Sequence, residues 1–319
     1  CCYRLCNHKT ATNYKTFCSK KGVIMPKALA IDIGGTKIYN SIVNEKGEII
    51  SEIEKHHTPK TFEEIKKIFK EIITAHENEA DVIAISTCGA VNNSNTGILG
   101  STGNIAKEYP TMDFMSLSKK KVFVENDANA AAWAEHIIGS SKGLPTSIMI
   151  TLGTGVGGGL ILNNRIFKGK NGAAGEMHFK MRTDKHRKCT CGSWDCFEAY
   201  ASGSGLKKTA EEISKNPNIT TYDVIGGWQK NDNLMTEIYK KWENDILEGL
   251  IGLANIFDPD VIVLSGSLAE FTNPEYLTEA VNKEIVTTPT KIVKGSAGNY
   301  SGMIGAALLA LGVGLGGDK

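Results

Sequence analysis

The sequence has no apolar run of the roughly 18–20 residues that a membrane-spanning helix requires, because glycine, threonine or a charged residue interrupts every apolar stretch. It also has almost no net charge, since 36 Lys and Arg residues balance 35 Asp and Glu residues. We find no local basic patch, and we therefore expect no nucleic-acid partner and no membrane partner. The first residues lack the apolar core of a secretory signal.

Eight cysteines are present, but they are not spread along the chain as a disulfide framework would be. Half of them lie in residues 1–24, three lie between residues 189 and 196, and Cys88 stands alone. This distribution fits a reducing compartment, and we predict a cytoplasmic protein.

Residues 1–24 differ in character from the rest of the chain. They begin without Met, whereas Met25 opens directly onto the apolar segment 28–33. We interpret residues 1–24 as an N-terminal extension that is non-native or disordered, with a natural start at Met25. The alternative is zinc capture by the extension, although the spacing of its ligands matches no standard pair. Those ligands would be Cys2, Cys6, His8 and Cys18.

After Met25, short apolar segments alternate with glycine and asparagine turns. The pattern predicts three antiparallel strands, an amphipathic helix capped by Thr61, two buried strands and a second helix. Their order is that of a ribonuclease H-like lobe. The expected elements cover residues 28–33, 37–43, 48–53, 61–76, 82–86, 121–124 and 128–138.

The second half opens on the same plan of strand, glycine turn and strand. Its expected elements cover residues 147–152, 158–162, 165–167, 204–215, 221–230, 234–257, 261–264 and 301–311. A chain of 319 residues also exceeds the ~250–300 residues at which one hydrophobic core stops growing. We therefore predict a duplicated α/β fold with two lobes and a central cleft. Residues 25–140 and the returning segment 300–319 would form one lobe, and residues 141–299 the other.

Two glycine turns occupy corresponding places in the two halves. The first reads Asp32-Ile-Gly-Gly-Thr-Lys37 and the second Leu152-Gly-Thr-Gly-Val-Gly-Gly-Gly159. Glycines let backbone N–H groups approach a phosphate, and Asp32 can hold Mg²⁺. A plain hairpin turn is the alternative for either one alone. The expected phosphate-binding residues are Asp32, Gly34, Gly35, Thr36, Lys37, Gly153, Thr154 and Gly155.

Strands follow both turns, which excludes two familiar phosphate-binding motifs. A dinucleotide-binding fingerprint needs a helix after its glycines, and a P-loop needs a Gly-x-x-x-x-Gly-Lys-Ser/Thr run. Neither is present. The remaining arrangement is the actin/hexokinase-like fold, in which two hairpins grip the terminal phosphates of ATP from opposite lobes.

Between the turns, a buried strand ends in Glu125-Asn-Asp127 where a helix begins. Asp127 could cap that helix. Alternatively, Asn126 and Asp127 project into the cleft, and Asp127 takes the proton of an attacking hydroxyl. Such general-base catalysis contributes roughly 10²–10⁴ in rate.

Together these motifs resemble the ROK family of sugar kinases and repressors. The resemblance extends from Met25 to about Leu311 and includes Gly175-Glu176, the cysteine segment 189–196 with Glu198, and Asp258-Pro-Asp-Val-Ile-Val-Leu-Ser-Gly266. It implies that Ser265-Gly266-Ser267 lies near the adenosine of ATP. It also implies a set of sugar-binding residues, namely Gly89, Thr102, Asn126, Asp127, Glu176 and Glu198.

The resemblance implies a kinase that uses ATP and Mg²⁺ to phosphorylate the 6-hydroxyl of a hexose or N-acetylhexosamine. N-acetylmannosamine and glucose rank nearly level as acceptors. The alternative is a sugar-sensing regulator without turnover. Family repressors carry a DNA-binding module of several dozen residues, and only 24 residues precede Met25, so we favour the kinase. Family members are commonly dimers, and we expect a homodimer.

The cysteine segment resembles the family's structural zinc site, in which three thiolates and one His form a tetrahedron. The family's His stands three residues after the Glu, a position that Phe179 occupies here. His178 is the leading alternative, His186 or water the next, and absence of metal the last. We expect zinc to fix the loop that bears Glu176 and Glu198. The expected ligands are Cys189, Cys191, Cys196 and His178.

Overall fold

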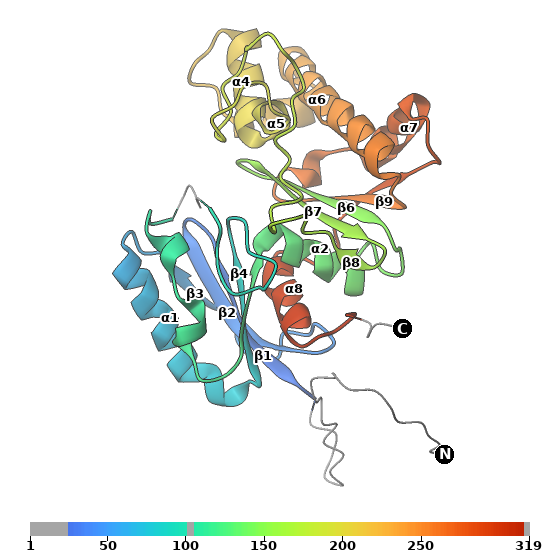
Figure 1. The fold of residues 1–319 in the computed structure, drawn as a ribbon. Helices are drawn as coiled ribbons and strands as arrows, with labels where there is room; N and C mark the ends of the chain where they lie inside the picture. Colours follow the sequence, from blue (N-terminus) through green and yellow to red (C-terminus); the bar gives the residue numbers. More distant parts are fainter. Residues whose placement is uncertain (1–24, 101–104, 316–319) are drawn as a thin grey trace, which may run out of the picture.

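The computed structural model describes residues 25–100 and 105–315 (Figure 1). The predictions for residues 1–24, for Thr102 and for residues 316–319 lie outside these ranges. Within the ranges, no helix combines the length and the apolar character needed to cross a membrane. Two mixed sheets with their helices form two lobes, which confirms the predicted α/β architecture.

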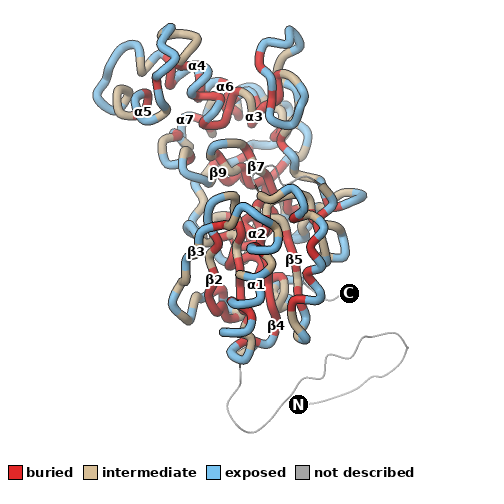
Figure 2. Tube along the Cα trace, turned by 90° about the vertical axis from the view of Figure 1, so that its left-hand side faces the viewer, coloured by how far each residue is buried: buried red, intermediate tan, exposed pale blue. Residues whose placement is uncertain are grey.

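The first sheet has the strand order β3-β2-β1-β4-β5. β2 pairs antiparallel with β1 and β3, whereas β1, β4 and β5 are parallel. Helix α1, Phe62–His76, begins at the predicted cap Thr61 and buries one apolar stripe against this sheet. In Figure 2 the strands are mostly buried while the outer face of α1 is exposed. The strands are β1 (Lys27–Ile33), β2 (Lys37–Asn44), β3 (Glu54–His57), β4 (Val82–Thr87) and β5 (Val122–Asn126).

The predicted strand at residues 48–53 is wrong. Only an isolated bridge joins Val43 and Ile49, and regular pairing with β2 resumes at β3. Backbone hydrogen bonds from Asn44 to Glu48 and from Ile50 to Ile42 flank this bridge, but a side chain interrupts the backbone ladder at Ser51. The hydroxyl of Ser51 accepts the backbone N–H of Ile42 at 2.9 Å and contacts the hydroxyl of Ser41 at 2.8 Å.

The second sheet repeats the plan with the order β10-β9-β6-β7-β8. β6, β7 and β8 are antiparallel, whereas β6, β9 and β10 are parallel. The sequence analysis missed β10 and the helix α7, Pro274–Glu284. The strands are β6 (Ser147–Leu152), β7 (Val156–Leu162), β8 (Arg165–Ile166), β9 (Val261–Ser265) and β10 (Lys291–Lys294).

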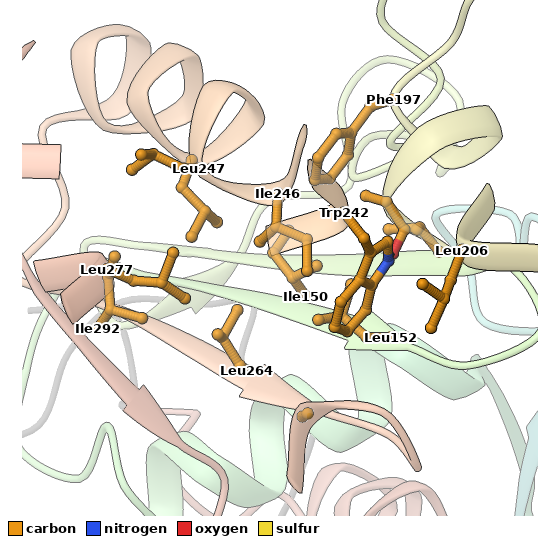
Figure 3. Close-up of a cluster of buried hydrophobic side chains, with 14 of the residues drawn as sticks. Ile150, Leu152, Phe197, Leu206, Trp242, Ile246, Leu247, Leu264, Leu277 and Ile292 are labelled. Atoms are coloured by element: carbon orange, nitrogen blue, oxygen red, sulfur yellow. The ribbon is translucent and has the colours of Figure 1, made fainter. Parts of the chain in front are cut away.

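A cluster of buried apolar side chains joins this sheet to the helices above it (Figure 3). Trp242 is fully buried among Ile150, Leu152 and Leu206, and its indole N–H donates to the carbonyl of Ala201 at 2.9 Å. Burial of such side chains contributes about 1.5–3 kcal/mol each. The helices are α3 (Glu198–Ala201), α4 (Gly203–Ser214), α5 (Thr221–Gln229) and α6 (Asn233–Phe257).

Two helices, α2 (Asp127–Ile137) and α8 (Ser301–Ala310), lie side by side between the sheets (Figure 1). Their approach depends on Gly305, because a Cβ there would lie 1.7 Å from the carbonyl oxygen of Ala130. α2 packs against β7 of the second sheet and against β5 of the first. Its N-terminus therefore presents Asp127 at the gap between the lobes.

Candidate active site

Asp127 is the first residue of α2, at the end of the buried strand β5. The helix cap is Asn126, whose side-chain oxygen accepts the backbone N–H of Asn129 at 3.0 Å. Asp127 therefore does not fill the capping role that its position allowed. Its Oδ1 accepts the N–H of Ala128 at 2.8 Å and the amide of Asn126 at 3.1 Å, contacts that fix the carboxylate.

The environment of Asp127 suits a base. Burial, reinforced by the charge of Asp32, raises the pKa of Asp127 to about 7. Burial also raises the pKa of Asp32, which lies near the end of β1. A carboxylate with a pKa near the working pH can both hold and release a proton, as general-base catalysis requires.

The two glycine turns face one another across one cavity of about 450 Å³. Asp32 and Gly34 line it from the first lobe, and Gly153 and Gly155 from the second, with Asp127 beside them. Gly266 and Gly302 are also among the lining residues. Gly35, Thr36, Lys37 and Thr154 belong to the same turns but do not line this cavity, and all of them except Gly35 are exposed.

Hydrogen bonds to residues of α3 and α4 fix the conformation of the second glycine turn. The carbonyl of Gly153 accepts the N–H of Gly203 at 2.8 Å, and that of Thr154 accepts the hydroxyl of Ser204 at 2.9 Å. Just after the turn, the N–H of Val156 donates to Glu198 at 3.0 Å. The conformation of this turn therefore depends on contacts within the second lobe.

A second cavity, of about 310 Å³, adjoins the first at Asp127. Asp127 and Glu198 line both cavities, so the two form one continuous cleft. The amide of Asn126 donates to the carbonyl of Gly89 at 3.1 Å and joins two walls of this second cavity. Five of the six predicted sugar-binding residues line it, namely Gly89, Asn126, Asp127, Glu176 and Glu198.

A third cavity, of about 470 Å³, continues from Gly266 away from Asp127. The segment Ser265-Gly266-Ser267 lines one side of this cavity. The connection between β10 and α8 forms the other side, including Gly298 and Asn299. The sequence analysis had identified only the first side.

The cysteine segment forms a compact cluster with His178. Ligand atoms of the four residues all lie within 4.8 Å of one another. Cys191 and Cys196 are 3.5 Å apart at sulfur, and Cys189 Sγ lies 3.6 Å from His178 Nδ1. A tetrahedral zinc ion with Zn–S distances near 2.3 Å places its ligands ~3.8 Å apart, so the donor set fits zinc.

The other candidates for a fourth ligand are engaged elsewhere. His186 Nε2 lies 3.2 Å from the carboxylate of Glu212. Phe179, which occupies the position of the family's His, stacks on Phe197 with ring centroids 5.1 Å apart. The geometry therefore favours His178, whose Nε2 lies 3.5 Å from Glu176.

A largely buried ion pair that no sequence motif marked lies beside Asn126. Lys168 Nζ lies 3.1 Å from Glu125 Oε2, and it also donates to the carbonyl of Asn92 at 3.1 Å. The other oxygen of Glu125 accepts the N–H of Asn126 at 2.9 Å. Glu125 had been noted only as part of a motif, and no sequence pattern marks Lys168.

Comparison with known proteins decides the family. The model of the ROK family matches residues 28–313. The chain belongs to the ROK family. This assignment confirms the resemblance drawn from the motifs.

Two curated relatives of this ROK protein are sugar kinases by name. The glucokinase of Streptomyces coelicolor is 30% identical, over 90% of this chain and 98% of that protein. The N-acetylmannosamine kinase of Haemophilus influenzae is 29% identical, over 88% of this chain and 94% of that protein.

Solved structures agree with the fold of the ROK protein. The ROK hexokinase of Thermus thermophilus superposes with a TM-score of 0.77 at 29% identity, covering 89% of this chain and 98% of that one. A ROK glucokinase from Streptomyces griseus, in complex with glucose and AMPPNP, gives 0.73 at 29% identity, covering 90% and 99%. A ROK transcriptional regulator, a homologue of the Escherichia coli MLC protein, gives 0.76 at 19% identity, covering 90% and 78%, and shows the fold alone.

Proposed function

We propose that this ROK protein transfers the terminal phosphate of ATP to the 6-hydroxyl of a hexose or N-acetylhexosamine. One observation carries the proposal above the others. Asp127, with its pKa raised to about 7, lies where a cavity between two glycine turns meets a cavity lined by polar side chains. A phosphate donor and a hydroxyl acceptor could therefore meet at one carboxylate.

In the proposed mechanism the second cavity binds the sugar. Asn126, Glu176 and Glu198 supply the polar groups that recognise hydroxyls. Asp127 accepts the proton of the attacking hydroxyl as the phosphate is transferred. The contacts of Asp127 Oδ1 to Ala128 and Asn126 keep the carboxylate oriented toward that hydroxyl.

The first cavity would hold the terminal phosphates of the nucleotide. Backbone groups of both glycine turns, from Gly34 and from Gly153 and Gly155, line the space. The carboxylate of Asp32 fits a role in holding Mg²⁺, which neutralises phosphate charge when it is bound with ATP. Closure of the lobes would exclude water and align donor and acceptor.

We also propose a structural zinc ion held by Cys189, Cys191, Cys196 and His178. Three thiolates and one imidazole are the ligands of closed structural zinc sites. The remaining ring nitrogen of His178 faces Glu176, an arrangement typical of ligands that a carboxylate orients. The ion would fix the wall of the sugar cavity.

Glucose and N-acetylmannosamine are the acceptors that we propose first, because the curated relatives are kinases named for these two sugars. A coupled assay of ADP release against hexoses and N-acetylhexosamines tests the proposal. We expect turnover with at least one of these two sugars. Sugar binding without any turnover would instead support a sugar-sensing regulator.

Two further proposals concern organisation. Residues 25–140 with 300–319 would form one lobe and residues 141–299 the other, with lobe closure as rigid-body motion. The protein would be a homodimer in solution. Sedimentation equilibrium would test the second point, and a monomer at micromolar concentration would contradict it.

A further inference from the structure

Glu135 is a carboxylate in the last turn of α2 that is only 1% exposed. It lines none of the three cavities of the cleft. Its oxygens nevertheless accept three backbone hydrogen bonds. Oε2 accepts from Ser140 at 2.7 Å and Ser296 at 3.1 Å, and Oε1 accepts from Ala297 at 2.8 Å. Charged acceptors make strong hydrogen bonds when water is excluded, so these three N–H groups are firmly held.

The three donors come from two connections that are distant in sequence. Ser140 lies between α2 and β6, where the chain passes from the first sheet to the second. Ser296 and Ala297 lie between β10 and α8, where it returns. In the described ranges these are the two crossings between the sheets. The hydroxyl of Ser140 also donates to the carbonyl of Lys294 at 2.7 Å, which joins the crossings directly.

Each crossing carries a glycine where the carboxylate lies. A Cβ at Gly139 would lie 2.1 Å from Glu135 Oε2, and one at Gly295 would lie 2.7 Å from Glu135 Oε1. Any larger residue would push the carboxylate out of place. The absence of a side chain at Gly139 and at Gly295 therefore leaves the space that the carboxylate of Glu135 occupies between the two crossings.

The returning crossing is also a wall of the third cavity. Lys294, Gly295, Gly298 and Asn299 line that cavity, and the two residues that Glu135 holds lie between them in sequence. We propose that Glu135 is a positioning residue for nucleotide binding, which fixes this wall and ties it to the other interlobe crossing. The inference rests on the proposed function only in taking the third cavity as the adenosine site.

The test is the affinity for AMPPNP of Glu135→Gln, measured by isothermal titration calorimetry beside the affinity for glucose and N-acetylmannosamine. Glutamine keeps the size of the side chain but turns an NH₂ group toward a backbone N–H, which leaves a buried donor unpaired. We expect the Kd for AMPPNP to rise about tenfold. The Kd for sugar should change by less than about twofold, a split that general destabilisation would not produce.

A second variant keeps the test valid if Glu135→Gln does not fold. Ser140→Ala removes only the side-chain hydroxyl, which donates to the carbonyl of Lys294 at 2.7 Å and lies 3.0 Å from the hydroxyl of Ser296, and both contacts are exposed. We expect a rise of about threefold in the Kd for AMPPNP, since two exposed hydrogen-bonding contacts between the crossings are lost. Glu135→Asp, which keeps the charge, should recover part of the affinity lost in Glu135→Gln.

Asp260→Asn is the matched control. Asp260 accepts the N–H of Thr146 at 2.9 Å in the first crossing, but it precedes β9 at the end opposite Ser265. Its AMPPNP affinity should equal that of the wild type. An unchanged AMPPNP Kd in Ser140→Ala and in any folded Glu135→Gln, or equal losses for sugar and nucleotide, would overturn this inference alone. A wild-type protein that binds no AMPPNP would overturn the kinase proposal and this inference with it.

Discussion

Glu198 Oε2 accepts the backbone N–H of Val156 at 3.0 Å, directly after the second glycine turn. The other oxygen of Glu198 lies 3.6 Å from Cys189 Sγ and accepts the hydroxyl of Thr190. One carboxylate therefore joins the second glycine turn to the cysteine cluster. If the turn binds phosphate as proposed, disturbing the cluster should affect nucleotide binding as well as sugar binding.

The first prediction concerns the fourth ligand of the proposed zinc site. His178→Ala should lower zinc affinity by about tenfold or more, because a tetrahedral site loses one of four ligands. His186→Ala is the matched control, since His186 contacts Glu212 outside the cluster. Metal analysis after dialysis against a mild chelator would separate the two variants. Equal zinc retention by both would remove His178 from the ligand set.

A second prediction follows from the pKa of Asp127. Because the proposed base must be ionised, kcat/KM for the sugar should fall by about tenfold per pH unit below the raised pKa, which is about 7. An ordinary aspartate would give this decline near pH 4. The pH profile of kcat/KM for the sugar measures it, because that ratio reports the ionisation of the enzyme before the sugar binds. A flat profile between pH 5 and pH 8 would contradict the assignment.

The same shift has a consequence for stability. Between the ordinary pKa of an aspartate and the raised value of about 7, the folded protein binds a proton at Asp127 that the unfolded chain has lost. The free energy of unfolding from this group therefore declines as pH rises through that window. Asp127→Asn removes the effect, and chemical denaturation should find the variant more stable than the wild type at pH 8. A variant that is less stable at that pH would contradict the raised pKa.

A further prediction concerns the buried pair Lys168–Glu125. Lys168→Met leaves the carboxylate of Glu125 buried without its cation, so the free energy of unfolding should fall by about 3–5 kcal/mol. Adding Glu125→Gln should recover part of the loss. Urea denaturation measures both. Lys283→Met, which breaks an exposed pair with Glu279, is the control and should change little.

Much of the fold could be predicted because strand and turn patterns repeat in the two halves. The positions of Asp32 near the end of β1 and of Asp127 directly after β5 were identified correctly, since a polar residue after an apolar run is visible in sequence. The strand at residues 48–53 was wrong because Ser51 makes its contacts with β2 through a side chain, which no hydrophobic pattern reveals. β10 has only four residues, and α7 buries only Leu277 and Val281.

The site was predictable to the extent that its residues lie in local motifs. His178 was ranked ahead of His186 as the fourth ligand, but linear spacing could not decide between them, because it does not show which imidazole turns toward the thiols. Lys168 and Glu135 were missed for a related reason. Lys168 and Glu125 are 43 residues apart in sequence, and Glu135 and Ser296 are 161 residues apart, so only the folded chain brings each pair together.

The most direct test of the account is the turnover of Asp127→Asn. Asparagine preserves the shape of the side chain and removes its capacity to take a proton. We predict that kcat falls by at least ~10²-fold while the Kd for AMPPNP and the cooperative unfolding transition are retained. Turnover within about threefold of the wild type, in a variant that is folded and binds nucleotide, would contradict the role of Asp127 as the base.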